Sequence, residues 1–413
     1  MLKTEKTKSD LQHLISIPVI VAALGYFVDI YDLLLFGVVR LPSLTDMGLT
    51  DSEISEIGVS ILNWQMTGLL VGGILWGVLG DKKGRLSVLF GSILTYSIAN
   101  ILCGFVQTPD IYKLLRFIAG VGLAGELGAG ITLVSEILPK RLRAIGTSLV
   151  AGVGLLGAVV AYFTVELFAW RTAYFIGGGM GISLLLLRIG VFESGIYEHV
   201  KQQKDIQKGN FFSLFTKKER FVRYLKCIGM GLPTWFVIGI LATFSNEIGA
   251  SLNLPDKIKP GLSIMWCYIG LSLGDLASGL ISHQLKSRKK AVSILMLITL
   301  IATLYYLFGG IKSTGVFYAI NLILGFGIGY WAMFVTIGAE QFGTNLRSTA
   351  ATTIPNMVRG TVVLMTTLFT SYKTDFTVIN SAALVGLICF IIGFYSILTI
   401  SETHDKDLDF LEY

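Results

Sequence analysis

The amino-acid sequence predicts an all-α integral membrane protein with twelve transmembrane helices in two six-helix halves. Of its 413 residues, 53% are hydrophobic and only 15% are charged, whereas a soluble domain carries about 25% charged residues. Apolar runs of about 20 residues, the length of helix that crosses a bilayer, recur along the chain. We place the spans near residues 14–37, 57–79, 86–106, 111–135, 144–167, 172–192, 225–248, 261–285, 290–310, 315–338, 349–370 and 377–399.

The basic residues predict the orientation of these spans. We count 22 lysines and arginines before span one and after spans two, four, six, eight and ten. The opposite loops hold seven: Arg40, Lys113, Arg171, Lys257, Lys259, Lys312 and Lys373. Because cytoplasmic loops carry the excess of basic residues, both termini are expected in the cytoplasm, with the protein multi-pass in a bacterial inner membrane.

The longest internal connection divides the chain into two halves that show a weak internal repeat. We expect a six-helix bundle at 1–193, a cytoplasmic linker at 194–224, and a second bundle with a short cytoplasmic tail at 225–413. The linker fits either an amphipathic segment lying against the membrane or a plain solvated connection. RFIAGVGLAGE, residues 116–126, resembles NLILGFGIGYW, residues 321–331, with glycines in register at 120/325 and 122/327. Repeated halves are common in secondary transporters, which bind substrate between them.

The turn GVLGDKKGRL, residues 77–86, connects spans two and three. It resembles the signature loop of the major facilitator superfamily in Gly77, Asp81, Lys82, Gly84 and Arg85. The resemblance implies the major facilitator fold, with inverted repeats of three helices in each half. It also implies a gating loop in which Asp81 pairs with Arg143 or its neighbours in one state and releases it in the other. Glu136 and Arg143, repeated as Glu340 and Arg347, are assigned to the same gate. The alternative is a loop that only fixes topology.

Ionisable residues within the spans are few, and each is costly at bilayer depth. Asp29 and Asp32 lie three residues apart on one face of span one. Span four contributes Arg116, placed to pair with Asp32, and Glu126 near the midplane. Close carboxylates in a poorly hydrated site are suited to binding and releasing a proton near neutral pH. The alternative is a structural ion pair that fixes helix register.

A closer resemblance covers these same segments. GYFVDIYDLLLFG, residues 25–37, is similar to the span-one motif of the metabolite:proton symporter family, with Asp29 where Glu is usual. RFIAGVGLAGE and the following VSEILPKRLR resemble that family's span-four segments, and the step from Arg188 to Ser194 also fits. The resemblance implies uptake driven by the proton gradient, with Asp32 as the coupling acid and Arg116 as its partner.

The C-terminal half offers candidates for substrate binding. Arg359 in span eleven could hold a substrate carboxylate by a bidentate pair, or it could pair with Asp275 of span eight. The assigned substrate-binding residues are Asn63, Gln65, Trp235, Asp275, Trp331, Asn356 and Arg359, and Asn246 and Glu247 are further candidates.

The sequence argues against other classes of protein. It has no phosphate-binding G-x-x-x-x-G-K-[ST] loop, the four cysteines stand singly in apolar spans, and the bases lie in short loops. We therefore expect no enzyme, no metal or other cofactor and no nucleic-acid partner. The favoured function is proton-coupled symport of a small metabolite, an organic anion such as a carboxylate, by a monomer in the lipid bilayer. Two alternatives are an exporter or proton antiporter of a larger compound, such as a carboxylate siderophore or drug, and a membrane sensor that keeps the transporter fold.

Overall fold

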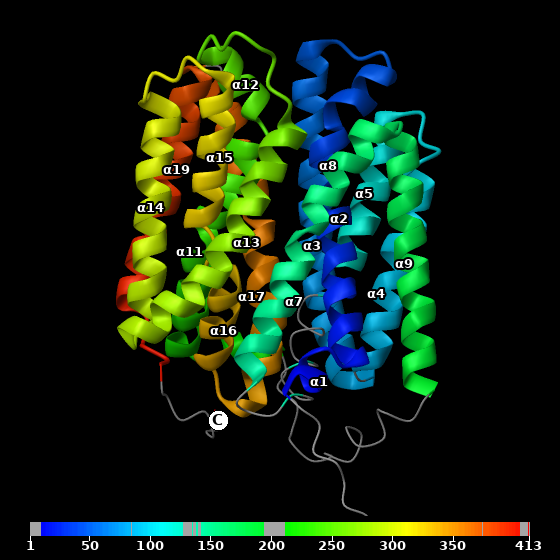
Figure 1. The fold of residues 1–413 in the computed structure, drawn as a ribbon, viewed down its shortest axis with the longest axis vertical. Helices are drawn as coiled ribbons and strands as arrows, with labels where there is room; N and C mark the ends of the chain where they lie inside the picture. The colour runs from blue at the N-terminus through cyan, green and yellow to red at the C-terminus, as the bar shows by residue number, and fades with distance from the viewer. Residues whose placement is uncertain are drawn as a thin grey trace, which may run out of the picture.

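The computed structural model describes residues 10–83, 85–126, 134, 138, 142–193, 211–373, 375–404 and 412. Within these residues the secondary structure is helical, and the helices stand side by side in two bundles (Figure 1). The N-terminal bundle contains α2 (Ile17–Asp46), α3 (Asp51–Lys83), α4 (Arg85–Cys103), α5 (Pro109–Leu123), α7 (Arg143–Leu155), α8 (Gly157–Leu167) and α9 (Trp170–Glu193). The C-terminal bundle contains α11 (Lys218–Phe236), the π-helix η3 (Val237–Ala242), α12 (Ser245–Ser251), α13 (Pro260–Leu285), α14 (Arg288–Phe308), α15 (Thr314–Gly327), α16 (Trp331–Glu340), α17 (Thr344–Gly360), α18 (Val362–Lys373) and α19 (Val378–Thr399).

Two further helices of the described chain are short. These are α1 (Asp10–Leu14) and the 3₁₀-helix η2 (Phe211–Phe215). The α1 helix lies at the bottom of Figure 1, which we call the lower end. The opposite end, where α2 joins α3 and α18 is followed by α19, is the upper end.

Each predicted span coincides with a helix or a pair of helices. Among the residues described, nine helices are long and apolar enough to cross a membrane, and Val88–Cys103 of α4 is a shorter apolar helix. The predicted span near 111–135 is described only in part, and the span near 349–370 corresponds to α17 and α18, where threonine, asparagine and arginine lower the hydropathy. The all-α membrane fold predicted from the sequence is confirmed.

The surface and the interior are reversed relative to a soluble protein. Large apolar side chains such as Leu167, Leu280 and Leu364 are at least 66% exposed. Among the described residues, nine charged side chains within the helical bundles are at most 7% exposed: Asp29, Asp32, Arg40, Arg116, Glu126, Arg188, Arg220, Asp275 and Arg359. This is the pattern expected when lipid is the solvent and the polar groups face the protein interior.

Matched glycines set the closest helix contacts in both bundles. A methyl group on Gly120 of α5 would overlap the main-chain carbonyl of Gln65 in α3. A methyl group on Gly325 of α15 would likewise overlap the carbonyl of Cys267 in α13. Small residues allow this close approach, which stabilises helix pairs where lipid gives no hydrophobic driving force. The glycine register in the sequence repeat therefore marks the same packing position in the two bundles.

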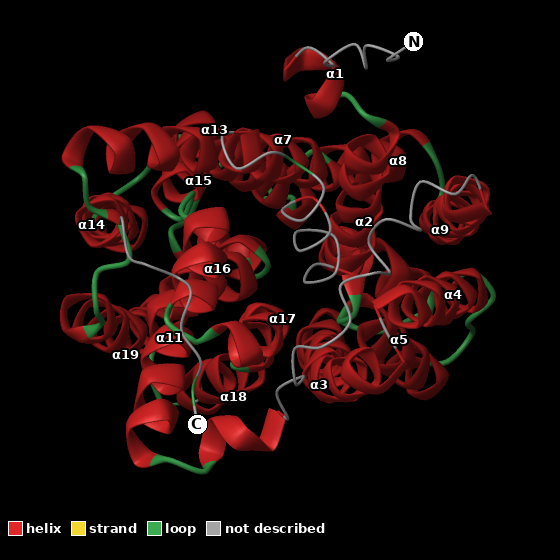
Figure 2. Ribbon diagram, turned by 90° about the horizontal axis from the view of Figure 1, so that it is seen from below, coloured by secondary structure: helices red, strands yellow, loops and turns green. Residues whose placement is uncertain are grey.

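The bundles meet along a long interface. In the N-terminal bundle it is formed by α2, α3, α7 and α8, which contact α13, α17 and α18. Seen from below in Figure 2, α7 lies beside α13, and α3 lies near α17 and α18. Polar and charged residues lie along this interface, which holds the candidate site.

Candidate functional site

Arg359 of α17 lies in an aromatic cage at the interface between the bundles. Its guanidinium carbon is 5.7 Å from the ring centroid of Trp235 and 5.9 Å from that of Trp331. The two indole rings are 6.2 Å apart and nearly perpendicular. Arg359 is 1% exposed, and it donates to Asn356 Oδ1 over a long 3.4 Å. The tryptophan faces attract the cation, and we call Arg359, Trp235 and Trp331 the arginine cage.

Asp29 of α2 approaches the arginine cage from the other bundle. Asp29 Oδ2 is 3.9 Å from Arg359 Nη2, and both side chains are at most 1% exposed. Within the described residues, neither carboxyl oxygen of Asp29 has a hydrogen-bond partner, and neither has Arg359 Nε. The contact is therefore a buried ion pair without a hydrogen bond, which leaves both groups poorly compensated for their loss of water.

Asp32 lies inside the N-terminal bundle, close to Arg116 but not paired through its carboxyl group. Arg116 donates to the main-chain carbonyl of Asp32 at 3.2 Å, to Asn100 Oδ1 at 2.7 Å and to Gln65 Oε1 at 3.3 Å. Both carboxyl oxygens of Asp32 are buried and have no hydrogen-bond partner in the part of the chain that the structure describes. The expected Asp32–Arg116 proximity is present, but the guanidinium is already occupied by neutral acceptors.

Glu126 forms an ion pair of its own, separate from Asp32 and Arg116. Arg188 of α9 holds Glu126 through both oxygens, with one hydrogen bond of 3.1 Å from Nη1 to Oε2 and a second, shorter one from Nη2 to Oε1. Both side chains are at most 4% exposed. Gly25 of α2 permits this pair, because a methyl group there would overlap both side chains. The bidentate contact fixes the orientation of both side chains.

Asp275 does not pair with Arg359 in this structure, and a pair between them in another state of the protein stays a prediction. Its Oδ1 accepts a hydrogen bond of 3.0 Å from the amide of Ala332, in the first turn of α16. A carboxylate at a helix N-terminus satisfies unpaired amides and complements the helix dipole. The helix is interrupted between α15 and α16, so Asp275 fixes the start of the second helix, which carries Trp331.

The three side-chain amides predicted to bind substrate make three different contacts. Asn356 donates to the carbonyl of Ala124 across the interface, at 2.9 Å. Asn63 accepts from Thr366 of the other bundle at 2.5 Å. Gln65 donates to the carbonyl of Leu33 at 2.8 Å, within its own bundle and next to Arg116. Asn356 and Asn63 therefore join the bundles, whereas Gln65 positions Arg116.

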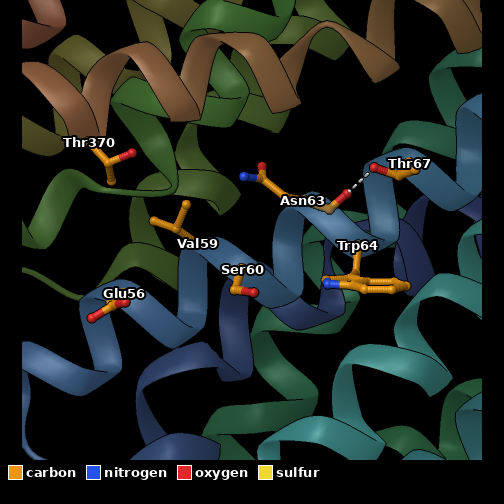
Figure 3. Close-up of a pocket in the computed structure, with 7 residues that line it drawn as sticks. All are labelled: Glu56, Val59, Ser60, Asn63, Trp64, Thr67 and Thr370. Atoms are coloured by element: carbon orange, nitrogen blue, oxygen red, sulfur yellow. Dashed lines mark hydrogen bonds between the residues drawn. The ribbon is translucent and has the colours of Figure 1, made fainter.

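A pocket of about 420 Å³ lies between α3 and α18, in the upper half of the molecule. Figure 3 shows Asn63 and Trp64 on α3, with Thr370 facing them from α18. Trp64 is 46% exposed and packs edge-on against Phe117. The remaining lining residues are Glu56, Val59, Ser60 and Thr67. Of the predicted substrate-binding residues, only Asn63 lines it, so this pocket is separate from the arginine cage.

A charged network closes the interface at the upper end. Arg40, fully buried, donates to the carbonyl of Thr243 at 3.0 Å and to Asn246 Oδ1 at 2.9 Å. Glu247 accepts from Ser55 at 2.9 Å and forms an ion pair with Lys373. Arg40 also lies 3.9 Å from Glu247. We call Arg40, Ser55, Asn246, Glu247 and Lys373 the upper-end network, and it joins the two bundles.

The predicted gating loop is described only in part. Gly77 lies beside Thr353 of α17, whose methyl carbon would be 3.7 Å from a Cβ at Gly77. Gly84 and Glu136 lie outside the described residues, as do the side chains of Asp81, Lys82, Arg85 and Arg143. In the C-terminal half, Glu340 forms an ion pair with Arg288, the first residue of α14.

Sequence reasoning did not identify Arg40 and Arg188 as site residues. Arg40 was assigned to a loop because span one was predicted to end near residue 37, whereas α2 continues to Asp46. Arg188 was noted only as part of a family motif. The signal in both cases is a lone arginine within or beside an apolar run, which needs a buried partner.

Comparisons with known proteins identify the fold family. The family model described as Major Facilitator Superfamily matches residues 22–362. A protein of Haemophilus influenzae, provisionally named as a metabolite transport protein, is 28% identical over 94% of this chain and 96% of its own length. A protein of Bacillus subtilis, provisionally named as a niacin/nicotinamide transporter, is 27% identical over 81% of this chain and 82% of its own. A gentisate transporter of Corynebacterium glutamicum is 25% identical over 78% of this chain and 73% of its own.

Proposed function

The chain belongs to the major facilitator superfamily, and on that premise we propose that it is a proton-coupled symporter for a small organic carboxylate. Because its relatives are named transporters, it is a multi-pass membrane transport protein and not an enzyme. The proposal places both termini in the cytoplasm of a bacterial cell, with the protein in the inner membrane as a monomer. The upper end then faces outward.

The observation that carries the proposal is the arginine cage. A buried guanidinium between two indole faces suits a planar carboxylate, which could receive two hydrogen bonds from the arginine and pack its ring against tryptophan. Niacin and gentisate, named in two relatives, are aromatic carboxylic acids. We therefore propose Arg359, Trp235, Trp331 and Asn356 as the substrate-binding residues.

The buried carboxyl groups support proton coupling. Asp29 and Asp32 are fully buried, and their carboxyl oxygens have no hydrogen-bond partner among the described residues. Acids placed in this way can take up a proton when the conformation changes, whereas Glu126 is already paired with Arg188. We therefore propose that protons bind at Asp29 and Asp32, and that Arg116 fixes the backbone of span one at Asp32. Glu126 serves as the partner of Arg188.

Alternating access supplies the transport cycle. The halves at residues 1–193 and 225–413 rock about the arginine cage, and 194–224 links them in this proposal. The upper-end network ties the bundles together on the outward side, which favours a conformation closed to the outside. Opening outward requires that Arg40 and Glu247 lose their partners in the other bundle.

Reconstituted proteoliposomes test this function. Purified protein is first screened by thermal shift against benzoate, niacin, gentisate and betaine at pH 6, and the stabilising compound is used as the radiolabelled probe. We expect an inward proton gradient to drive uphill accumulation, and Asp32→Asn to reduce that accumulation while sparing exchange of labelled for unlabelled substrate. Asp110→Asn, at an exposed carboxylate of α5, is the matched control. Accumulation by Asp32→Asn equal to that of the wild type would remove Asp32 from coupling, and accumulation independent of the proton gradient would refute symport.

A further inference from the structure

We infer that Asp29 is an internal substitute for the transported carboxylate, so that substrate takes its place at Arg359 when Asp29 receives a proton. The inference rests on the proposed function and assigns the coupling step to one ion pair. It goes beyond a general role for acids in span one, because it predicts that proton and substrate exchange at the same guanidinium.

The first support is the incomplete pairing of the two groups. The 3.9 Å between Asp29 Oδ2 and Arg359 Nη2 exceeds hydrogen-bond distance. A guanidinium offers five N–H donors, and among the described residues the polar side-chain contacts of Arg359 are this ion pair and the long bond to Asn356. An anion that reaches the guanidinium at hydrogen-bond distance would therefore bind more strongly than Asp29 does now.

The second support is charge balance in a buried site. With Asp29 ionised, one anion neutralises Arg359, and a substrate carboxylate would add a second negative charge away from water. With Asp29 protonated and no substrate, Arg359 would be left as an uncompensated buried cation. Both states are unfavourable because isolated charges are costly in a low dielectric. The favoured states hold either ionised Asp29 alone or protonated Asp29 together with the substrate carboxylate.

The exchange is balanced in atoms and charge. One proton from solution binds a carboxyl oxygen of Asp29, the Asp29–Arg359 ion pair breaks, and an ion pair forms between Arg359 and the substrate carboxylate. The net charge of the pair is zero before and after the exchange. This step therefore couples one proton to each monovalent carboxylate.

The third support is the position of the pair between the moving parts. Asp29 belongs to α2 and Arg359 to α17, so the ion pair joins the bundles. Substrate bound at the arginine cage would replace a contact between bundles with a contact to the C-terminal bundle. Binding would thereby release one tie at the centre of the interface.

The other ionisable groups around Asp29 do not supply a competing cation. Arg188 lies against Gly25, one helical turn before Asp29, and is paired with Glu126. Further groups near Asp29 or its neighbours are phenols and acids: Tyr26 and Asp32 on α2, Tyr96 on α4, and Tyr268 and Asp275 on α13. Arg359 is therefore the base whose pairing changes when Asp29 is protonated.

The test measures benzoate affinity and proton uptake together in purified protein. Titration calorimetry in buffers of different ionisation enthalpy gives the number of protons bound with each benzoate between pH 5 and pH 8. For the wild type we expect one proton per benzoate at high pH, with the Kd rising tenfold per pH unit. Asp29→Asn should bind no proton with benzoate, show a Kd independent of pH, and bind at least tenfold more tightly than the wild type at pH 8.

The matched variant is Asp32→Asn, which removes the other unpaired carboxyl group of span one. It should keep both the proton uptake and the pH dependence of benzoate binding. Proton uptake that persists in Asp29→Asn would overturn the inference, and so would loss of uptake in Asp32→Asn alone. No benzoate binding by folded, monodisperse Asp29→Asn at any pH would also overturn it, because the freed Arg359 should bind a small carboxylate. The proposed function fails separately, if wild-type proteoliposomes show no accumulation driven by the proton gradient.

Discussion

Replacing Glu247 by glutamine should open the upper end of the protein. Glu247 is 15% exposed in its side chain and faces Arg40 and Lys373, which are 1% and 21% exposed. Glutamine keeps an acceptor for Ser55 but removes the negative charge, so Arg40 stays buried without a counter-ion. Opening would let water reach Arg40 and relieve that cost.

The magnitude follows from the burial of the partners. Breaking a fully buried ion pair costs about 3–5 kcal/mol, and an exposed pair is worth less than about 1 kcal/mol. The partly exposed Glu247 lies between these limits, so we expect the closed state to lose about 2–3 kcal/mol, which is a shift of roughly 30- to 150-fold in the equilibrium.

The assay is a distance measurement between spin labels at the upper end. Cysteines introduced at the exposed positions Gln107 and Lys312 carry one label on each bundle, and the native cysteines are buried. We expect Glu247→Gln to add a longer distance that the wild type lacks. The control is Glu166→Gln, which removes an exposed ion pair to Lys259 at the same end and should leave the distances unchanged. Identical distance distributions in wild type and Glu247→Gln would refute the reasoning, as would an equal shift in the control.

Three further predictions concern stability and are checked by thermal unfolding in detergent. Glu126→Gln should lower the Tm, because breaking its buried ion pair with Arg188 costs about 3–5 kcal/mol of stability. Adding Arg188→Met should recover part of that loss. Gly120→Ala should lower the Tm because its methyl group overlaps a carbonyl of α3, whereas Gly179→Ala, with open space around it, should not. Glu402, although partly desolvated, accepts hydrogen bonds from the Ser287 hydroxyl, from main-chain amides in the first turn of α14 and from the amides of the two residues that follow it, and these bonds hold its pKa at about 2, below its usual 4.5. Its stabilisation is therefore full above about pH 4.5 and is lost as the pH falls toward 2, so the Tm difference between wild type and Glu402→Gln should shrink over that range.

The site residues that could be identified from the sequence are those whose burial follows from the hydropathy of the surrounding segment. Asp29, Asp32 and Arg359 each interrupt an apolar run, and an ionisable group in such a run must face a partner. The glycine register at 120 and 325 also follows from the sequence, because the repeat aligns the two segments. Their partners did not follow in the same way, as the alternative of an Asp275–Arg359 pair shows.

Asp275 and Arg359 are both single charges within spans, so opposite charge alone suggested a pair. The structure instead gives Asp275 to the amide of Ala332, because α15 and α16 are separate helices and the second needs a partner at its N-terminus. Hydropathy does not reveal that break within one apolar segment. The Asp275 carboxylate caps α16 only because the tertiary structure places α13 beside α16.

The sequence by itself determined the membrane class, the positions of the spans and the identity of most buried charges, because these depend on hydropathy and length within a single segment. Only the tertiary structure decided which charges meet. Asp29 faces Arg359, more than three hundred positions away, and Glu126 binds Arg188 instead of joining the two aspartates. The physical reason is that an ion pair requires two helix faces to approach within a few ångströms, and that approach is set by the packing of all the helices together.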